Sequence, residues 1–160
     1  MIGCIIGSFR KYYDDIISII RLFEENGHEI LSPKISCIDR DEDGFVILKS
    51  DNVNYSHVDI QTLVFHRVFQ SDFVYVWNPN GYVGRTTCYE LGRIIERNVP
   101  IYYKEVPKDV PIYIPRGSVI SVEEFIEYLN SKNKLPKYLE ENNAITKELL
   151  SDLANNKFHN

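Results

Sequence analysis

Residues 1–33 of the chain read MIGCIIGSFRKYYDDIISIIRLFEENGHEILSP: an apolar run, an amphipathic segment and a second apolar run. The first run, Ile2–Ile6, predicts a buried strand, and His28–Leu31 predicts the next one. Between them, a helix is expected to end at Asn26-Gly27. Its apolar positions recur at helical spacing: Tyr13, Ile16, Ile17, Ile20 and Phe23. A strand, a helix and a strand within about 30 residues predict a βαβ unit with two parallel strands and a right-handed crossover.

The same alternation continues along the chain. Further strands are expected at 73–77, 100–103 and 112–114, which makes five, and further helices at 54–70, 88–98 and 121–129. Ser121 and Glu124 have the spacing of a capping box. Residues 35–50 hold two β-rich runs around an acidic turn, which predicts an inserted β-hairpin. We therefore expect one α/β domain over residues 1–130 and a helical C-terminal tail over residues 131–160.

Composition narrows the class of protein. The chain has 160 residues, of which 44% are hydrophobic and 26% charged, as in an average globular domain. Its formal charge is 18 − 23 = −5, so no general affinity for nucleic acid is expected. The three cysteines lie far apart and form no CxxC pair, which disfavours a disulfide scaffold and suits a reducing cytoplasm. No apolar run approaches the roughly 18 residues of a membrane span, so a soluble cytoplasmic protein is expected.

The first loop that could hold a ligand is Gly7-Ser8-Phe9-Arg10, between the first strand and the first helix. In a parallel sheet, ligands bind at the carboxyl ends of strands and near helix N-termini. Gly7 allows close approach of the backbone, Ser8 offers a hydroxyl, and Arg10 is a planar cation suited to phosphate. The alternative is that Ser8 is only an N-cap and Arg10 only a surface residue.

The second such loop is residues 78–87, which leads into Glu90. Its candidate binding residues are Asn78, Gly81, Gly84, Arg85 and Thr86. Glu90 is expected one turn inside the following helix, where its carboxylate can face the same crevice. The alternative is structural, because Thr87 and Glu90 have the spacing of a capping box.

Metal sites are not expected. Asp39, Asp41, Asp43 and Gly44 copy the first half of a calcium loop, but Ser50 stands where the bidentate glutamate belongs. The four histidines show no i, i+4 pairing.

Three stretches together carry a family resemblance: residues 3–10 with 27–33, residues 65–78, and residues 81–93. They resemble the nucleoside 2-deoxyribosyltransferase-like superfamily, which includes the 2'-deoxynucleoside 5'-monophosphate N-glycosidases. The resemblance implies a doubly wound, Rossmann- or flavodoxin-like sheet of five parallel strands, assembled as homo-oligomers. It also implies an N-glycosidase or deoxyribosyltransferase that cleaves a nucleoside or nucleoside monophosphate without a cofactor.

The resemblance also assigns residues. Glu90 matches the family's nucleophilic glutamate, and Gly7, Ser8 and Arg10 match the loop that holds the sugar or its 5'-phosphate. Gly84 to Thr86 match the loop beside it. Val64 stands where the family usually carries an acid, so a partner acid is expected from Asp59 or Asp72, or a proton from His66. The alternatives are a catalytically silent nucleotide-binding or sensing module, and an N-glycosidase acting on NAD or another nucleotide.

Overall fold

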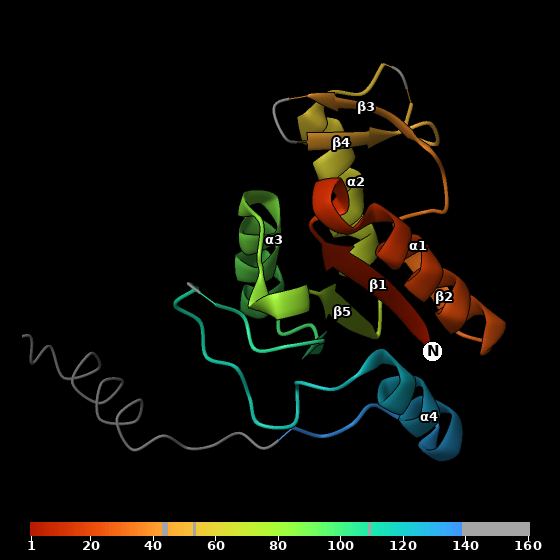
Figure 1. The fold of residues 1–160 in the computed structure, drawn as a ribbon, viewed down its shortest axis with the longest axis vertical. Coiled ribbons are helices and arrows are strands. Elements are labelled where there is room, and N and C mark those ends of the chain that lie inside the picture. The colour runs from red at the N-terminus through yellow and green to blue at the C-terminus, as the bar shows by residue number, and fades with distance from the viewer. Residues whose placement is uncertain (43–44, 53, 109, 139–160) are drawn as a thin grey trace, which may run out of the picture.

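The main sheet has four parallel strands in the order β2-β1-β5-β6 (Figure 1). The computed structural model describes residues 1–42, 45–52, 54–108 and 110–138. The strands are β1 (Ile2–Gly7), β2 (Glu29–Ser32), β5 (Phe73–Trp77) and β6 (Ile101–Tyr103). The α/β class and the parallel βαβ unit are therefore confirmed.

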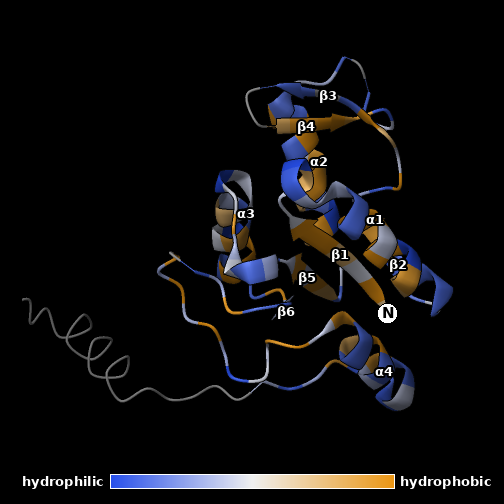
Figure 2. Cartoon of the chain, viewed as in Figure 1, coloured by the Kyte–Doolittle hydropathy of each residue, from blue (hydrophilic) through white to orange (hydrophobic). Residues whose placement is uncertain are grey.

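The two central strands, β1 and β5, are buried on both faces except at Ile2 and Trp77, which is why they consist of apolar residues and glycine (Figure 2). Their register pairs Gly3 with Phe73. A Cβ atom at Gly3 would stand 2.3 Å from the tip of the Phe73 ring, so residue 3 has room only for hydrogen.

Helices cover both faces of the sheet. On one face, α1 (Phe9–Glu25) and α4 (Val122–Lys132) share a core cluster with aromatic residues of the strands. On the other face, α2 (His57–Val68) and α3 (Arg85–Glu96) pack against a second cluster. The polypeptide thus winds in both directions from β1. Within the described residues, the structure has no helix with the length and apolar character needed to cross a bilayer.

The prediction of a fifth strand at residues 112–114 is wrong. Pro111 and Pro115 flank this segment and cannot donate hydrogen bonds to a strand ladder. The side chains of Ile112 and Ile114 instead pack against the core cluster of α2 and α3. Among the described residues, the sheet edge beside β6 receives one isolated parallel bridge, between Tyr103 and Val119.

The expected hairpin is present as a separate antiparallel pair, β3 (Ile38–Glu42) and β4 (Phe45–Leu48). Two contacts attach it to the start of α2. The His57 ring stacks on Phe45 with 4.7 Å between ring centroids, and His57 Nε2 lies 2.8 Å from Glu42 Oε2. The hairpin therefore lies beside α2 at the top of the view in Figure 1.

Helix ends differ from expectation only locally. α2 begins at His57 because Ser56 and Asp59 form a capping box, which we did not expect from the sequence. The capping box of Ser121 and Glu124 at α4 is confirmed. The helix expected within the tail after residue 138 lies outside the described residues.

Replacing Ser121 by Ala is expected to lower the free energy of unfolding by about 1 kcal/mol. The Ser121 hydroxyl accepts from Glu124 N at 3.3 Å and donates to Glu124 Oε2 at 2.7 Å, and both bonds would be lost. The measurement is urea unfolding. Ser18→Ala is the matched control, because exposed Ser18 lies inside α1 and only donates back to Asp14 O. This substitution should lower the free energy of unfolding much less.

Candidate functional site

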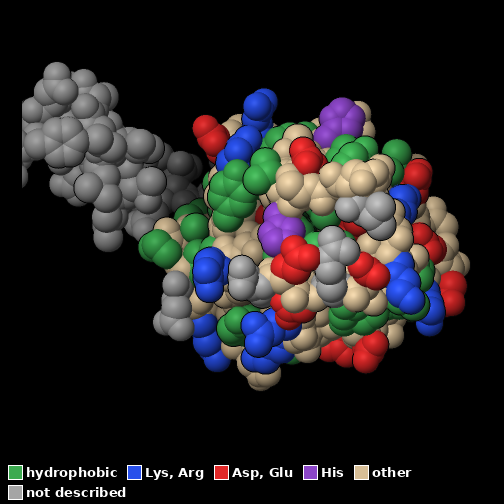
Figure 3. Space-filling model, turned by 90° about the horizontal axis from the view of Figure 1, so that it is seen from above, with side chains coloured by type: hydrophobic (Ala, Val, Ile, Leu, Met, Phe, Trp, Pro, Cys, Tyr) green, Lys and Arg blue, Asp and Glu red, His purple; other side chains and the backbone are tan. Residues whose placement is uncertain are grey.

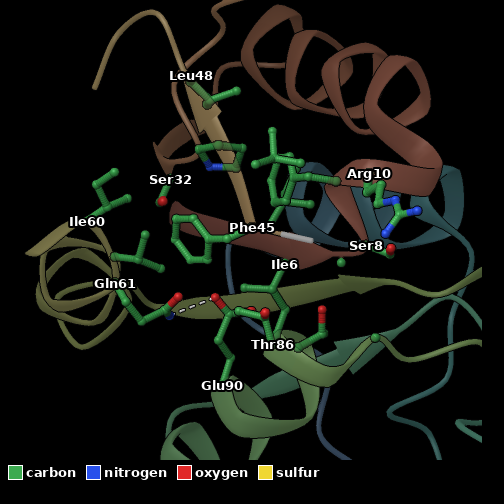
Figure 4. Close-up of a pocket in the computed structure, with 18 of the residues that line it drawn as sticks. Ile6, Ser8, Arg10, Ser32, Phe45, Leu48, Ile60, Gln61, Thr86 and Glu90 are labelled. Carbon is green, nitrogen blue, oxygen red and sulfur yellow. Dashed lines mark hydrogen bonds between the residues drawn. The ribbon is translucent and has the colours of Figure 1, made fainter. Parts of the chain in front are cut away.

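A cavity of about 350 Å³ opens at the carboxyl ends of β1 and β5. The chain leaves β1 toward β2 and leaves β5 toward β6, so this is the switch point at which ligands bind in open α/β sheets. The walls come from the loop between β1 and α1, the start of α3, strand β4 of the hairpin, and α2. Figure 4 shows side chains of these elements facing one another across the cavity.

The first wall is the Gly7–Arg10 loop. A Cβ atom at Gly7 would lie 2.6 Å from the Trp77 carbonyl oxygen, so only glycine lets β1 and β5 end this close together. Ser8 is the N-cap of α1, but its side chain makes no capping hydrogen bond. Arg10 is largely exposed, and its Nε lies 3.5 Å from Asp41 Oδ2 of the hairpin. Gly7, Ser8, Phe9 and Arg10 all line the cavity.

The second wall is the start of α3. Gly84 is the N-cap of this helix, so Thr87 and Glu90 lie inside it and the structural alternative, a capping box formed by these two residues, is wrong. Gly84, Arg85, Thr86 and Glu90 line the cavity. A Cβ atom at Gly84 would stand 3.7 Å from Ser8 Oγ, so the two loops are in contact.

Glu90 is the buried acid of this cavity. Its side chain is 8% exposed, and Oε1 accepts a hydrogen bond from Gln61 Nε2 of α2 at 2.9 Å (Figure 4). The other carboxylate oxygen has no hydrogen-bond partner among the described residues. Burial raises the pKa of Glu90 to about 7, although the bond from Gln61 opposes the shift. The Glu90 side chain is therefore present in both its protonated and its ionised form near neutral pH. A buried acid with such a pKa in a cleft is typical of functional sites.

Two candidate binding residues of the second loop lie elsewhere. The buried Asn78 amide donates to Glu105 O at 2.7 Å and accepts from Glu105 N at 3.1 Å, so it holds the segment after β6. Gly81 has φ +70°, and a Cβ atom there would lie 2.6 Å from the Val106 carbonyl oxygen. Neither residue is part of the cavity wall.

The three candidate proton donors also lie away from the cavity. Asp59 belongs to the capping box of α2, whose hydrogen bonds from Ser56 lower the pKa of its carboxyl. Asp72 accepts from Ile2 N at 2.8 Å, at the opposite end of the sheet. The ring of His66 contacts Gln70 on the exposed side of α2.

Residues that the sequence reasoning missed complete the cavity: Lys34, Phe45, Asp51, Gln61 and Arg67. Asp51 Oδ2 accepts a hydrogen bond from Leu48 N at 2.8 Å, so this carboxylate stabilises the end of β4. One signal was available: a hairpin inserted directly after the carboxyl end of β2 must lie on the ligand-binding side of the sheet.

The cavity is more basic than the rest of the chain. Its wall holds four cations, Arg10, Lys34, Arg67 and Arg85, against two acids, Asp51 and Glu90, in a chain of formal charge −5. On the face of the molecule that carries the hairpin, acidic and basic side chains are interspersed (Figure 3). The cationic excess of the cavity therefore favours an anionic ligand.

Within the described residues, no three His, Cys, Asp or Glu side chains are grouped so that they could hold a metal ion. Comparisons of the chain with protein-family models, with curated proteins and with solved structures found no match.

Proposed function

We propose that this protein cleaves the N-glycosidic bond of a nucleoside 5'-monophosphate, with Glu90 as the nucleophile. The observation that carries the proposal is the buried Glu90 carboxylate in the wall of a basic cavity at the switch point of the sheet. The resemblance of residues 3–10 and 81–93 to the nucleoside 2-deoxyribosyltransferase-like superfamily points to the same glutamate.

Glu90 would attack C1' of the sugar while the bond to the base nitrogen breaks. The transition state resembles an oxocarbenium ion, and a glycosyl ester on Glu90 is then resolved by water or by a second base. Gln61 holds one carboxylate oxygen through its amide, which positions the other oxygen for attack. A nucleophile with a pKa near 7 is about half ionised at neutral pH, so the rate should rise as Glu90 deprotonates.

The 5'-phosphate would lie at the N-terminus of α1. The free N–H groups and partial positive charge of a helix start favour an anion there, and Arg10 and Arg85 add two guanidinium groups from the loops on either side. The Ser8 hydroxyl, which makes no capping bond, is available to donate to the same phosphate.

Replacing Arg10 by Ala is expected to weaken binding of a nucleoside monophosphate about tenfold and to leave binding of the unphosphorylated nucleoside nearly unchanged. Calorimetric titration of both ligands measures the difference. Arg21→Ala removes an exposed arginine from the same helix, outside the cavity, and should change neither affinity. An equal loss for both ligands would contradict a phosphate contact by Arg10.

The test of activity is a panel of nucleosides, their monophosphates and NAD, with released base measured by chromatography.

One observation favours a second function, a catalytically silent nucleotide-binding module: Asp59, Asp72 and His66 all lie away from the cavity. Base release from any member of the panel excludes the silent module. Nucleotide binding without base release would instead support it.

A further inference from the structure

A second pair of cations lines the cavity apart from the phosphate loop. Lys34 follows the carboxyl end of β2, and Arg67 lies in the last turn of α2. The Lys34 amine donates to Ile30 O at 3.2 Å, which holds it against the edge of the sheet. In the part of the chain that the structure describes, the half-buried Arg67 guanidinium has no hydrogen bond and no ion pair. A half-buried cation without a partner is costly unless a ligand supplies the counter-charge.

Both cations lie near Cys4 of β1. Burial raises the pKa of the Cys4 thiol to about 11, and the charges of Arg67 and Lys34 both oppose that shift. Cys4 precedes Gly7 by three residues in the strand, which is a rise of about 10 Å. Lys34 follows β2, whose Ser32 pairs with Cys4, and Arg67 belongs to α2, so both cations come from the elements that face the Gly7–Arg10 loop across the cavity (Figure 4).

The space between these cations and the Gly7–Arg10 loop suits a base. Figure 4 shows Ser8 and Arg10 on one side of the cavity and Ser32 and Ile60 on the other, with Phe45 and Glu90 between. Ile60, Val64 and Phe45 supply the apolar surface that a planar ring needs. With the phosphate at the Gly7–Arg10 loop and C1' at Glu90, the base extends toward Lys34 and Arg67.

We infer that Lys34 and Arg67 stabilise the departing base as an anion, so that the site prefers bases with an acidic ring N–H, the oxo-purines and oxo-pyrimidines. The inference rests on the proposed function. It also accounts for the cavity wall, which carries Val64 and these cations but none of the three candidate proton donors.

In the step, the bond from C1' to the base nitrogen breaks and its electron pair stays on that nitrogen. The bond from a Glu90 oxygen to C1' forms at the same time. The base leaves with one negative charge next to the cations and takes its proton from water afterwards. Because this charge develops in the transition state, its stabilisation raises kcat more than it lowers KM.

The experiment compares 2'-deoxyinosine with 2'-deoxyadenosine 5'-monophosphate, and 2'-deoxyuridine with 2'-deoxycytidine 5'-monophosphate. Within each pair, size is matched and only the oxo or amino character of the base differs. We expect the wild type to release the oxo-bases faster. Arg67→Met keeps the aliphatic stem without the charge and should lower kcat for the oxo-bases roughly ten- to a hundredfold, with a much smaller change for the amino-bases.

Arg67→Lys should restore most of the preference, because it keeps the charge. Arg93→Met is the matched control: Arg93 lies over the Phe65 ring at 5.1 Å, outside the cavity, and its loss should leave the ratio unchanged. Thermal melts check that each variant is folded. A wild type without preference, or an equal loss for both members of a pair in Arg67→Met, overturns the inference and leaves the proposed function standing. Absence of base release from every substrate overturns both.

Discussion

Base release is expected to fall at least about a thousandfold when Glu90 is replaced by Gln, while the protein remains folded. The amide keeps the size of the side chain and can still accept the hydrogen bond from Gln61, but it cannot attack C1'. The measurement is single-turnover base release by wild type and variant, with circular dichroism to check the fold.

The matched control is Glu96→Gln. Glu96 is an exposed glutamate at the end of the same helix and lies outside the cavity. Its loss should leave base release unchanged. If Glu90→Gln retained wild-type activity, the covalent mechanism would be wrong, because no amide replaces a carboxylate nucleophile.

The same substitution is expected to make the protein more stable at alkaline pH. Burial raises the pKa of Glu90 from its ordinary 4.5 to about 7, so the folded state disfavours the charged form. Wild-type stability then falls as pH rises from about 4.5 through about 7, and stays low above that range. A shift of this size corresponds to about 3 kcal/mol in the free energy of unfolding.

Because Glu90→Gln has no carboxylate at this position, its free energy of unfolding should not fall over this pH range. The difference in unfolding free energy between variant and wild type should therefore grow by about 3 kcal/mol in favour of the variant between roughly pH 4 and pH 8. Urea unfolding at a series of pH values measures it, with Glu96→Gln as the control whose difference stays flat. A flat difference for Glu90→Gln as well would show that Glu90 is not buried as a charge.

Much of the fold was predictable because its signals are local. The spacing of apolar residues between 13 and 23 and the Asn26-Gly27 stop define α1, and continuous apolar runs define β1 and β5. The prediction of a fifth strand failed although a local signal, the two flanking prolines, was present in the sequence. Ile112 and Ile114 are typical strand residues, but the flanking prolines lack the N–H groups that a strand ladder needs. Both isoleucine side chains instead pack against the core cluster of α2 and α3, which the sequence pattern does not show.

The site was predictable for the residues that directly follow the carboxyl ends of the central strands. Gly7 to Arg10 and Gly84 to Glu90 each follow a central strand, and topology places both at one edge of the sheet. The role of Gln61 depends on how α2 packs against α3, which no local pattern reports. The capping box of Thr87 and Glu90 failed because the N-cap of α3 is Gly84, three residues before Thr87.

The hairpin contributes to the cavity wall from outside the main sheet. Glu90 and the Gly7–Arg10 loop belong to the main sheet and its helices, whereas Phe45 reaches the cavity from a two-stranded insertion that contacts His57. Changes in β3 and β4 can therefore alter which ring fits against Phe45 without disturbing either core cluster. In laboratory evolution, substitutions in β3 and β4 should change which ring shapes fit beside Phe45, whereas the preference for oxo-bases should follow Lys34 and Arg67.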